Sequence, residues 1–280
     1  MSRSWAAVLD TAAAARVTLV LGAIDAGKTT LVTRLAGALA GAGHTVGVVD
    51  ADLGQSDVGP PTTVGLGRVR RPIERLAEAD LVAIEFLGAT SPARCLRGTA
   101  EATARLVRRA LELGCDRVVV DTSGLVAGPL GLALKRLKID RVAPDVLLVM
   151  QRTDECEPIV RAAAQAPGRA TIRLAAATTP RRSPEARRLA RRRALQAHLA
   201  GAAPVTLDLA RVALRPAPAA RGLSLTEGVL VALDGPHGRT LGLGWVESVD
   251  APAARLVVNT AVEAARIAAV AIGRERYDAA

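Results

Sequence analysis

The chain contains few aromatic residues, lysines and cysteines, and each shortage narrows what it can be. Aromatic residues make up 1% of its 280 residues, so the core must be aliphatic. Cysteine occurs three times without a C-x-x-C pair, which argues against a disulfide framework or a zinc cluster. No apolar run is long enough to span a membrane and no signal peptide is recognisable. We therefore expect a cytoplasmic protein without a membrane partner.

The composition that remains is hydrophobic, alanine-rich and basic. Half of the residues are hydrophobic, which is enough for a sizeable core, and the length suits one or two domains. Of the 37 basic residues only Lys28, Lys135 and Lys138 are lysines, an imbalance typical of a GC-rich coding sequence. The net charge of +10 is concentrated in residues 161–200, which contain ten arginines and a single acidic residue, Glu185.

The most specific motif lies near the start, where residues 22–29 fit G-x-x-x-x-G-K-[ST] at every fixed position. An apolar run precedes it and a helical pattern follows, the strand–loop–helix setting that a phosphate-binding loop requires. Lys28 would reach the β- and γ-phosphates and Thr29 would ligate Mg²⁺, whereas a chance glycine turn is the weaker explanation. We predict that a nucleoside triphosphate is bound by Gly22, Ala23, Ile24, Asp25, Ala26, Gly27, Lys28, Thr29 and Thr30.

Apolar β-type runs alternate with helical patterns as far as about residue 200. This alternation predicts an α/β fold of the P-loop NTPase type, with a doubly wound, mostly parallel sheet covered on both faces. After Pro204 short β-rich runs follow one another between glycine-rich turns. We therefore expect a P-loop domain over 1–203 and a small all-β domain over 204–280. The expected strands of the first domain are 17–22, 46–50, 81–87, 117–121, 145–150 and 170–174, and its helices are 28–41, 99–113, 129–138 and 157–165.

Two of the expected strands end in acidic residues. Strand 46–50 leads into Asp50-Ala51-Asp52, and strand 117–121 ends at Asp121. Ligands of parallel sheets collect at the carboxyl ends of the strands. We expect Asp52 to be the general base for an attacking hydroxyl and Asp121 to act on Mg²⁺ or its water shell. Asp50 should either lie on the Mg²⁺ side or support the groups that contact the metal. A capping pair at an ordinary turn is the alternative for Asp50 and Asp52.

The arginine-rich segment contains a helix expected at about 183–199, with Ser183 as its N-cap and Pro184 at its first position. Arg187 and Arg191 share one face of this helix. A solvated helix face would explain the charge, and so would a polyanion-binding patch. Because the segment accompanies a phosphate-binding loop, we expect a lid whose arginines lie over the γ-phosphate.

Taken together, these elements resemble the polynucleotide 5′-hydroxyl kinases. That family includes the RNA kinases of eukaryotic mRNA 3′-end and ribosomal RNA processing and their archaeal and bacterial relatives. The resemblance covers nearly the whole chain. It rests on Asp25 in the phosphate-binding loop, Asp50-x-Asp52-x-Gly54-Gln55, Gly59-Pro60-Pro61-Thr62-Thr63, Phe86-Leu87-Gly88-Ala89-Thr90-Ser91-Pro92, Asp121-Thr122-Ser123-Gly124, the spacing of Arg182, Arg187 and Arg191, and the β-rich segment 228–250.

This resemblance implies that ATP, with Mg²⁺, donates its γ-phosphate to the 5′-hydroxyl end of a nucleic acid, with RNA favoured and DNA left open. It implies that Lys28 holds phosphate, Thr29 holds the metal and Asp52 activates the hydroxyl. Many relatives carry tryptophan where this chain has Leu125, so a stacking surface for the terminal base is missing there. The resemblance assigns charge stabilisation to Arg187 and Arg191, and binding of the terminal nucleotide to Gln55, Thr122, Ser123, Gly124 and Arg182.

Two other classes of protein share part of this pattern. A switch ATPase or GTPase of the chromosome-partitioning or metal-chaperone type has the same loop and a similar D-T-x-G element, and it needs no polynucleotide acceptor. The partition-type loop carries a second lysine near its start, which this chain lacks. A non-catalytic scaffold that keeps ATP as a structural ligand would not need the full set of nominal catalytic groups. Residues 151–154 depart from the Asn-Lys-x-Asp guanine reader, so they do not specify guanine.

Overall fold

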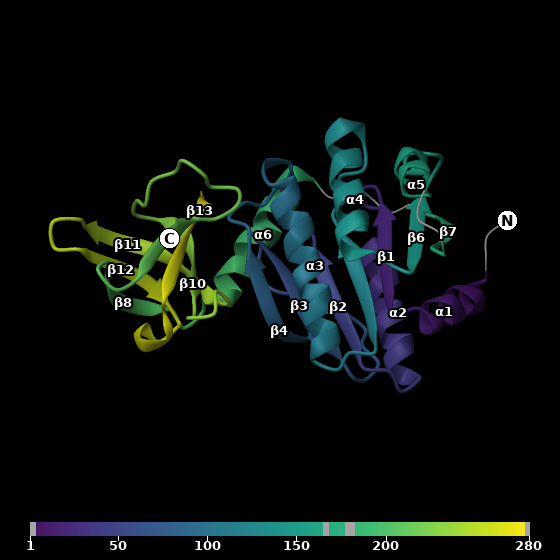
Figure 1. Ribbon diagram of the computed structural model, residues 1–280, viewed down its shortest axis with the longest axis horizontal. Coiled ribbons are helices and arrows are strands. Elements are labelled where there is room, and N and C mark those ends of the chain that lie inside the picture. The colour runs from purple at the N-terminus through teal and green to yellow at the C-terminus, as the bar shows by residue number, and fades with distance from the viewer. Residues whose placement is uncertain (1–3, 165–167, 177–182, 278–280) are drawn as a thin grey trace.

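The computed structural model describes residues 4–164, 168–176 and 183–277. A parallel sheet with the strand order β7-β6-β1-β5-β2 forms the centre of its larger part (Figure 1). Every residue of β1 is buried, as expected for a strand that is covered on both faces. The expected α/β fold with a mostly parallel central sheet is confirmed. The parallel strands are β1 (Val17–Gly22), β2 (Val46–Ala51), β5 (Arg117–Thr122), β6 (Val146–Gln151) and β7 (Ala170–Ala175).

Two antiparallel strands extend this sheet beyond β2. They are β3 (Thr63–Val69) and β4 (Asp80–Phe86). The sequence pattern missed β3 and placed 81–87 in the parallel alternation, and that expectation is wrong. Parallel neighbours need a crossover of a dozen or more residues, usually a helix. Here the chain turns back at 59–62 without a helix, and only a short 3-10 helix (Leu76–Glu78) lies between β3 and β4.

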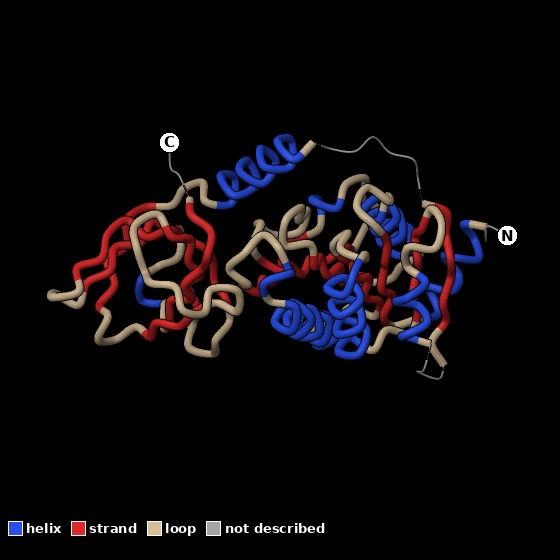
Figure 2. The backbone as a smooth tube through the Cα atoms, turned by 90° about the horizontal axis from the view of Figure 1, so that it is seen from above, coloured by secondary structure: helices blue, strands red, loops and turns tan. Residues whose placement is uncertain are grey.

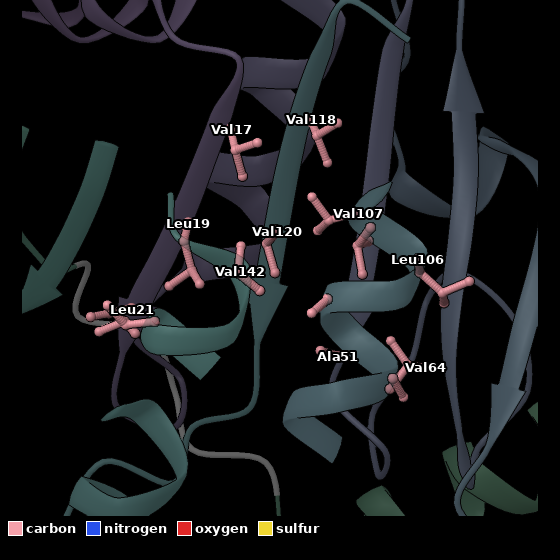
Figure 3. Packing of buried hydrophobic residues seen from close by; sticks show 14 of the residues in the cluster. Val17, Leu19, Leu21, Ala51, Val64, Leu106, Val107, Val118, Val120 and Val142 are labelled. Carbon is pink, nitrogen blue, oxygen red and sulfur yellow. The ribbon is translucent and has the colours of Figure 1, made fainter. Parts of the chain in front are cut away.

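Helices cover both faces of the central sheet. On one face, α1 (Trp5–Ala14) and α2 (Lys28–Gly41) pack against side chains such as Val20 and Val48. The opposite face is covered by α3 (Leu96–Glu112), α4 (Gly128–Val142) and α5 (Glu157–Ala163). Figure 3 shows this second face, where Leu19 and Val120 of the strands meet Val107 and Val142 of the helices. The alternation between faces follows from the period of two along each strand.

The C-terminal part consists mainly of antiparallel strands and begins with β8 (Ala203–Asp208). The first β-rich run after Pro204, residues 205–214, is divided between β8 and β9 (Ala213–Pro216). Thr240 of β11 pairs with Ile84 of β4, so one sheet continues from the larger part into the smaller one. The remaining strands are β9 (Ala213–Pro216), β10 (Val229–Asp234), β11 (Thr240–Asp250), β12 (Arg255–Thr260) and β13 (Ala269–Arg276).

The segment 86–92 joins the two parts. The carbonyl of Leu87 accepts a hydrogen bond from Ala219 N at 3.0 Å, and that of Gly88 accepts one from Arg274 N at 2.7 Å. Glu275 Oε1 accepts hydrogen bonds from the backbone N and the hydroxyl of Thr90, at 3.1 and 3.2 Å. Segment 86–92 therefore has a structural role, because its hydrogen bonds connect the C-terminal strands to the central sheet.

The helix α6 (Pro184–His198) runs along one side of the molecule, between the central sheet and the C-terminal strands (Figure 2). Its N-cap is Ser183, whose Oγ accepts a hydrogen bond from Ala186 N at 3.1 Å, as the sequence indicated. None of the helices in the described part of the chain is both long and apolar enough to cross a membrane.

Candidate active site

The loop between β1 and α2 has the backbone geometry of a phosphate-binding loop. Gly27 is the N-cap of α2 with φ +88°, and Asp25 has φ +57°, so the chain turns sharply and exposes the amides at the start of the helix. Lys28 is buried and its Nζ donates to Ala23 O at 2.8 Å. Burial lowers the pKa of Lys28, and the nearby Asp121 carboxylate opposes this shift. The N–H groups, the helix dipole and Lys28 can all act on one anion.

Thr29, in the first turn of α2, lies beside Asp121 near the end of β5. The hydroxyl of Thr29 donates to Asp121 Oδ2 at 2.7 Å. Asp121 Oδ1 is buried without a hydrogen-bond partner among the described residues, and burial raises the pKa of this carboxyl group. A hydroxyl and a carboxylate oxygen suit Mg²⁺, which usually takes one or two protein ligands besides phosphate and water. These two side chains therefore fit a magnesium ion.

Asp50 organises the loop that follows β2. Its Oδ1 accepts from Asp52 N at 3.0 Å, and its Oδ2 accepts from Ser56 Oγ, Asp57 N and Val58 N at 2.7–3.1 Å. Burial, and next the neighbouring Asp121, raise the pKa of Asp50 to about 8. The loop occupies both oxygens of Asp50, whereas Asp121 Oδ1 has no partner among the described residues, so Asp121 is better placed to contact a metal ion. A supporting role of Asp50 beside Asp121 stays a prediction.

Asp52 and Gln55 lie on this same loop, nearer to solvent. Asp52 Oδ1 accepts from Gly54 N at 3.0 Å and from Gln55 N at 3.1 Å, which fixes the direction of the carboxylate. The side chain of Gln55 donates to Gly54 O at 2.7 Å and to Arg187 O of α6 at 3.3 Å. The loop after β2 is thus in direct contact with the arginine-rich helix.

The residues after β5 have different roles. Thr122 is 1% exposed, and its hydroxyl donates to Val20 O at 2.8 Å and accepts from Lys135 Nζ at 2.8 Å. It belongs to the scaffold, and this geometry does not support the predicted contact with a nucleotide. Ser123 Oγ is buried without a partner in the described chain. A Cβ on Gly124 would lie 2.6 Å from the Cα and N atoms of Ile24, so only glycine fits against the phosphate-binding loop there.

The helix α6 is anchored to that loop by an ion pair. Arg187 Nη2 lies 2.6 Å from Asp25 Oδ2, and both side chains are mostly buried, at 21% and 17% exposure. Arg152, at the end of β6, donates to Asp25 O at 2.9 Å. The predicted Arg182 lies outside the described residues. A cavity of about 620 Å³ opens between the loop and the helix, lined by Ala23, Ile24, Asp25, Gly124, Val126, Ala127, Arg152, Glu155, Pro184, Arg187, Arg188 and Arg191.

Two residues of the site were missed by sequence reasoning, Lys135 and Lys138 of α4. Both are 0% exposed, and their ammonium groups lie beneath the strand ends that carry the acidic residues. A signal was present in the sequence, because these are the only lysines besides Lys28 in a chain that otherwise uses arginine. The excess of arginine over lysine is explained by coding bias. The few positions that nevertheless keep lysine were the ones that indicated a function.

Comparison with known proteins agrees with this arrangement. Residues 22–201 match the family described as mRNA cleavage and polyadenylation factor CLP1 P-loop. A polyribonucleotide 5′-hydroxyl-kinase of Thermococcus kodakarensis is 33% identical over 81% of this chain and 62% of its own length. A protein of the same name from Pyrococcus furiosus is 37% identical over 51% of this chain and 40% of its own. The chain thus spans less than two thirds of the length of these curated relatives.

Solved structures show a similar fold at low sequence identity. A wild-type Clp1p–Pcf11p complex has a TM-score of 0.71 with 12% identity, and the match covers 93% of this chain and 74% of that one. A second Clp1p structure, described by its interface with Pcf11p and by ATP loss in a point mutant, has a TM-score of 0.71 with 13% identity. At this identity the likeness concerns the fold alone.

Proposed function

The chain belongs to the CLP1 P-loop family, and we propose that it is a kinase that transfers the γ-phosphate of ATP to the 5′-hydroxyl end of RNA. The names of its curated relatives support this activity and this acceptor. Membership of a P-loop family carries nucleotide binding with it. The choice of ATP, the magnesium ion and the RNA end are parts of the proposal.

One observation carries the proposal beyond nucleotide binding. The helix α6 contacts the phosphate-binding loop through Arg187 and Asp25, and the loop after β2 through Gln55 and Arg187 O. A donor site, a basic helix and a carboxylate suited to an acceptor are therefore adjacent. A switch ATPase has no polynucleotide acceptor to bind, so the basic helix beside this site favours a kinase over that alternative.

In the proposed transfer, the residues of the site have separate roles. Lys28 and the loop amides would hold the phosphates, and Thr29 with Asp121 would hold Mg²⁺, which neutralises phosphate charge when bound. Asp52 would accept the proton of the 5′-hydroxyl as its oxygen bonds to the γ-phosphorus, while the bond from that phosphorus to the ADP oxygen breaks. Arg187 and Arg191 would stabilise the charge that is transferred, once Arg187 exchanges Asp25 for phosphate oxygens. Gln55 would contact the acceptor.

The test is transfer of γ-labelled phosphate from ATP to matched RNA and DNA oligonucleotides that carry a 5′-hydroxyl. We expect labelled RNA from the wild-type chain and none from Lys28→Ala. Asp52→Asn should keep only a small residual transfer rate while its ATP affinity changes little, because the amide cannot accept the proton. Phosphate release that depends on Lys28 but ignores every 5′-hydroxyl end would instead establish the switch ATPase.

A further inference from the structure

All three lysines of the chain gather at one place in the fold. Lys28 lies in the phosphate-binding loop, while Lys135 and Lys138 lie one turn apart on α4. All three are buried, although the arginines of this chain are mostly found at its surface. Neither lysine of α4 has a direct role in the proposed transfer, so their presence needs another explanation.

Each lysine of α4 holds the end of a different strand. Lys138 Nζ donates to Ala51 O of β2 at 3.0 Å. Lys135 Nζ donates to Thr122 Oγ1 of β5 at 2.8 Å and also to Ser123 O. Ala51 and Thr122 are direct partners in the parallel pairing of β2 and β5. The side-chain nitrogens of the two lysines therefore bind two residues that pair with each other across β2 and β5.

The strand positions bound by the two lysines are next to the acidic residues of the site. Ala51 stands between Asp50 and Asp52, and Thr122 follows Asp121. Burial lowers the pKa of Lys138 to about 8, and the Asp52 carboxylate is the strongest influence in the opposite direction. Burying an ammonium group is costly, and a methionine could fill the same space without that cost. A methionine, however, could not donate a hydrogen bond to Ala51 O or Thr122 Oγ1, so the lysines are retained for these bonds to the strand ends.

We propose that Lys135 and Lys138 are positioning residues that fix the ends of β5 and β2 relative to each other and so place Asp52 against the phosphate-binding loop. This inference rests on the proposed kinase function. The loop amides of Gly54 and Gln55 orient the carboxylate of Asp52 from within its own loop. Lys138 fixes the preceding residue from the protein side, so Asp52 is held in the direction that a proton acceptor needs.

The test compares the wild-type chain with Lys138→Met, Asp52→Asn and the double variant in the transfer assay. A misplacement of about 1 Å can cost about 10²-fold in rate, so Lys138→Met should lower kcat by that order. Its KM for ATP and its ATP affinity should stay within about 3-fold of wild type, because the phosphate-binding loop is untouched. Arg136→Met is the matched control, since Arg136 lies on the same helix with its side chain 63% exposed, and it should leave kcat unchanged.

The double variant separates positioning from general stability. If Lys138 acts through Asp52, adding Lys138→Met to Asp52→Asn should slow transfer by less than about 3-fold. The inference is overturned if the rate losses of the two single variants multiply in the double variant. It is also overturned if Lys138→Met leaves kcat unchanged, or if its loss of rate is accompanied by losses of ATP affinity and of melting temperature. If the wild-type chain transfers no phosphate, the kinase proposal fails. The same variants are then compared by Lys28-dependent ATP hydrolysis, for which the inference requires the same rate loss in Lys138→Met.

Discussion

Gly124 is the residue at which the segment after β5 comes closest to the phosphate-binding loop. A Cβ at this position would meet backbone atoms of Ile24, which cannot rotate away as a flexible side chain can. The restriction is steric, because Gly124 is not among the glycines with positive φ. Its identity is therefore set by a close approach between two functional segments.

We expect Gly124→Ala to weaken ATP binding by about 10-fold or more, since overpacking at a rigid contact costs about 1–3 kcal/mol. Titration calorimetry with ATP measures this effect. Gly235→Ala is the matched control, because the nearest atoms to its added Cβ belong to the Leu241 side chain at 3.4 Å. Wild-type affinity in Gly124→Ala would show that the loop can shift, contrary to this expectation.

Sequence alone could not assign the roles of Asp50 and Thr122. Both residues have the chemistry of a functional group and stand at strand ends, as do Asp52 and Ser123. Their roles differ because of contacts that are distant in sequence, such as the bond from Lys135 to Thr122. The phosphate-binding loop was predictable, because its motif and its flanking strand and helix are local features.

Among the elements, α6 is the one that the sequence predicted most completely. Its role, however, depends on what it packs against in the folded chain. Its bounds, Pro184–His198, agree with the capping residues and with the charge pattern. The structure places Arg187 beside Asp25 of the phosphate-binding loop, while a position of Arg187 and Arg191 over the γ-phosphate stays a prediction. The strand β3 could not be anticipated in the same way, because its direction depends on the turn at 59–62.

We expect Arg187→Ala and Arg191→Ala each to lower kcat far more than they raise the KM for ATP. An arginine that stabilises transferring phosphate can contribute about 10³–10⁵ in rate. Steady-state kinetics with RNA as acceptor measure the split between the two constants. Arg193→Ala, an exposed position on the same helix, is the control. If all three variants only weaken binding in a salt-dependent manner, α6 is a polyanion patch.

At the scale of the whole molecule, a shared core connects the two parts of the chain. Ile84 and Phe86 of β4 pack in one buried cluster with Leu230 and Ala232 of β10 and Leu243 of β11. The predicted division at 203–204 marks a change of architecture from alternating helices and strands to a mainly antiparallel sheet. It does not mark an interruption of the core.

We therefore expect the two parts to unfold in one cooperative transition. The two tryptophans make this measurable, because Trp5 lies on α1 and Trp245 on β11. Single-tryptophan variants, Trp245→Phe and Trp5→Phe, should give the same urea midpoint by fluorescence, and that midpoint should match circular dichroism. A clearly lower midpoint for the Trp245 signal would mean that the C-terminal strands unfold on their own.

The bond between Thr90 and Glu275 has a consequence for the time course of synthesis. Gly54 packs closely on the carbonyl of Thr90, and the amide of Thr90 is held by a carboxylate that lies 185 residues later in the chain. The segment that supports Asp52 gains its last partner only when β13 has been made. The surroundings of Asp52 therefore cannot be completed before almost the whole chain has been translated.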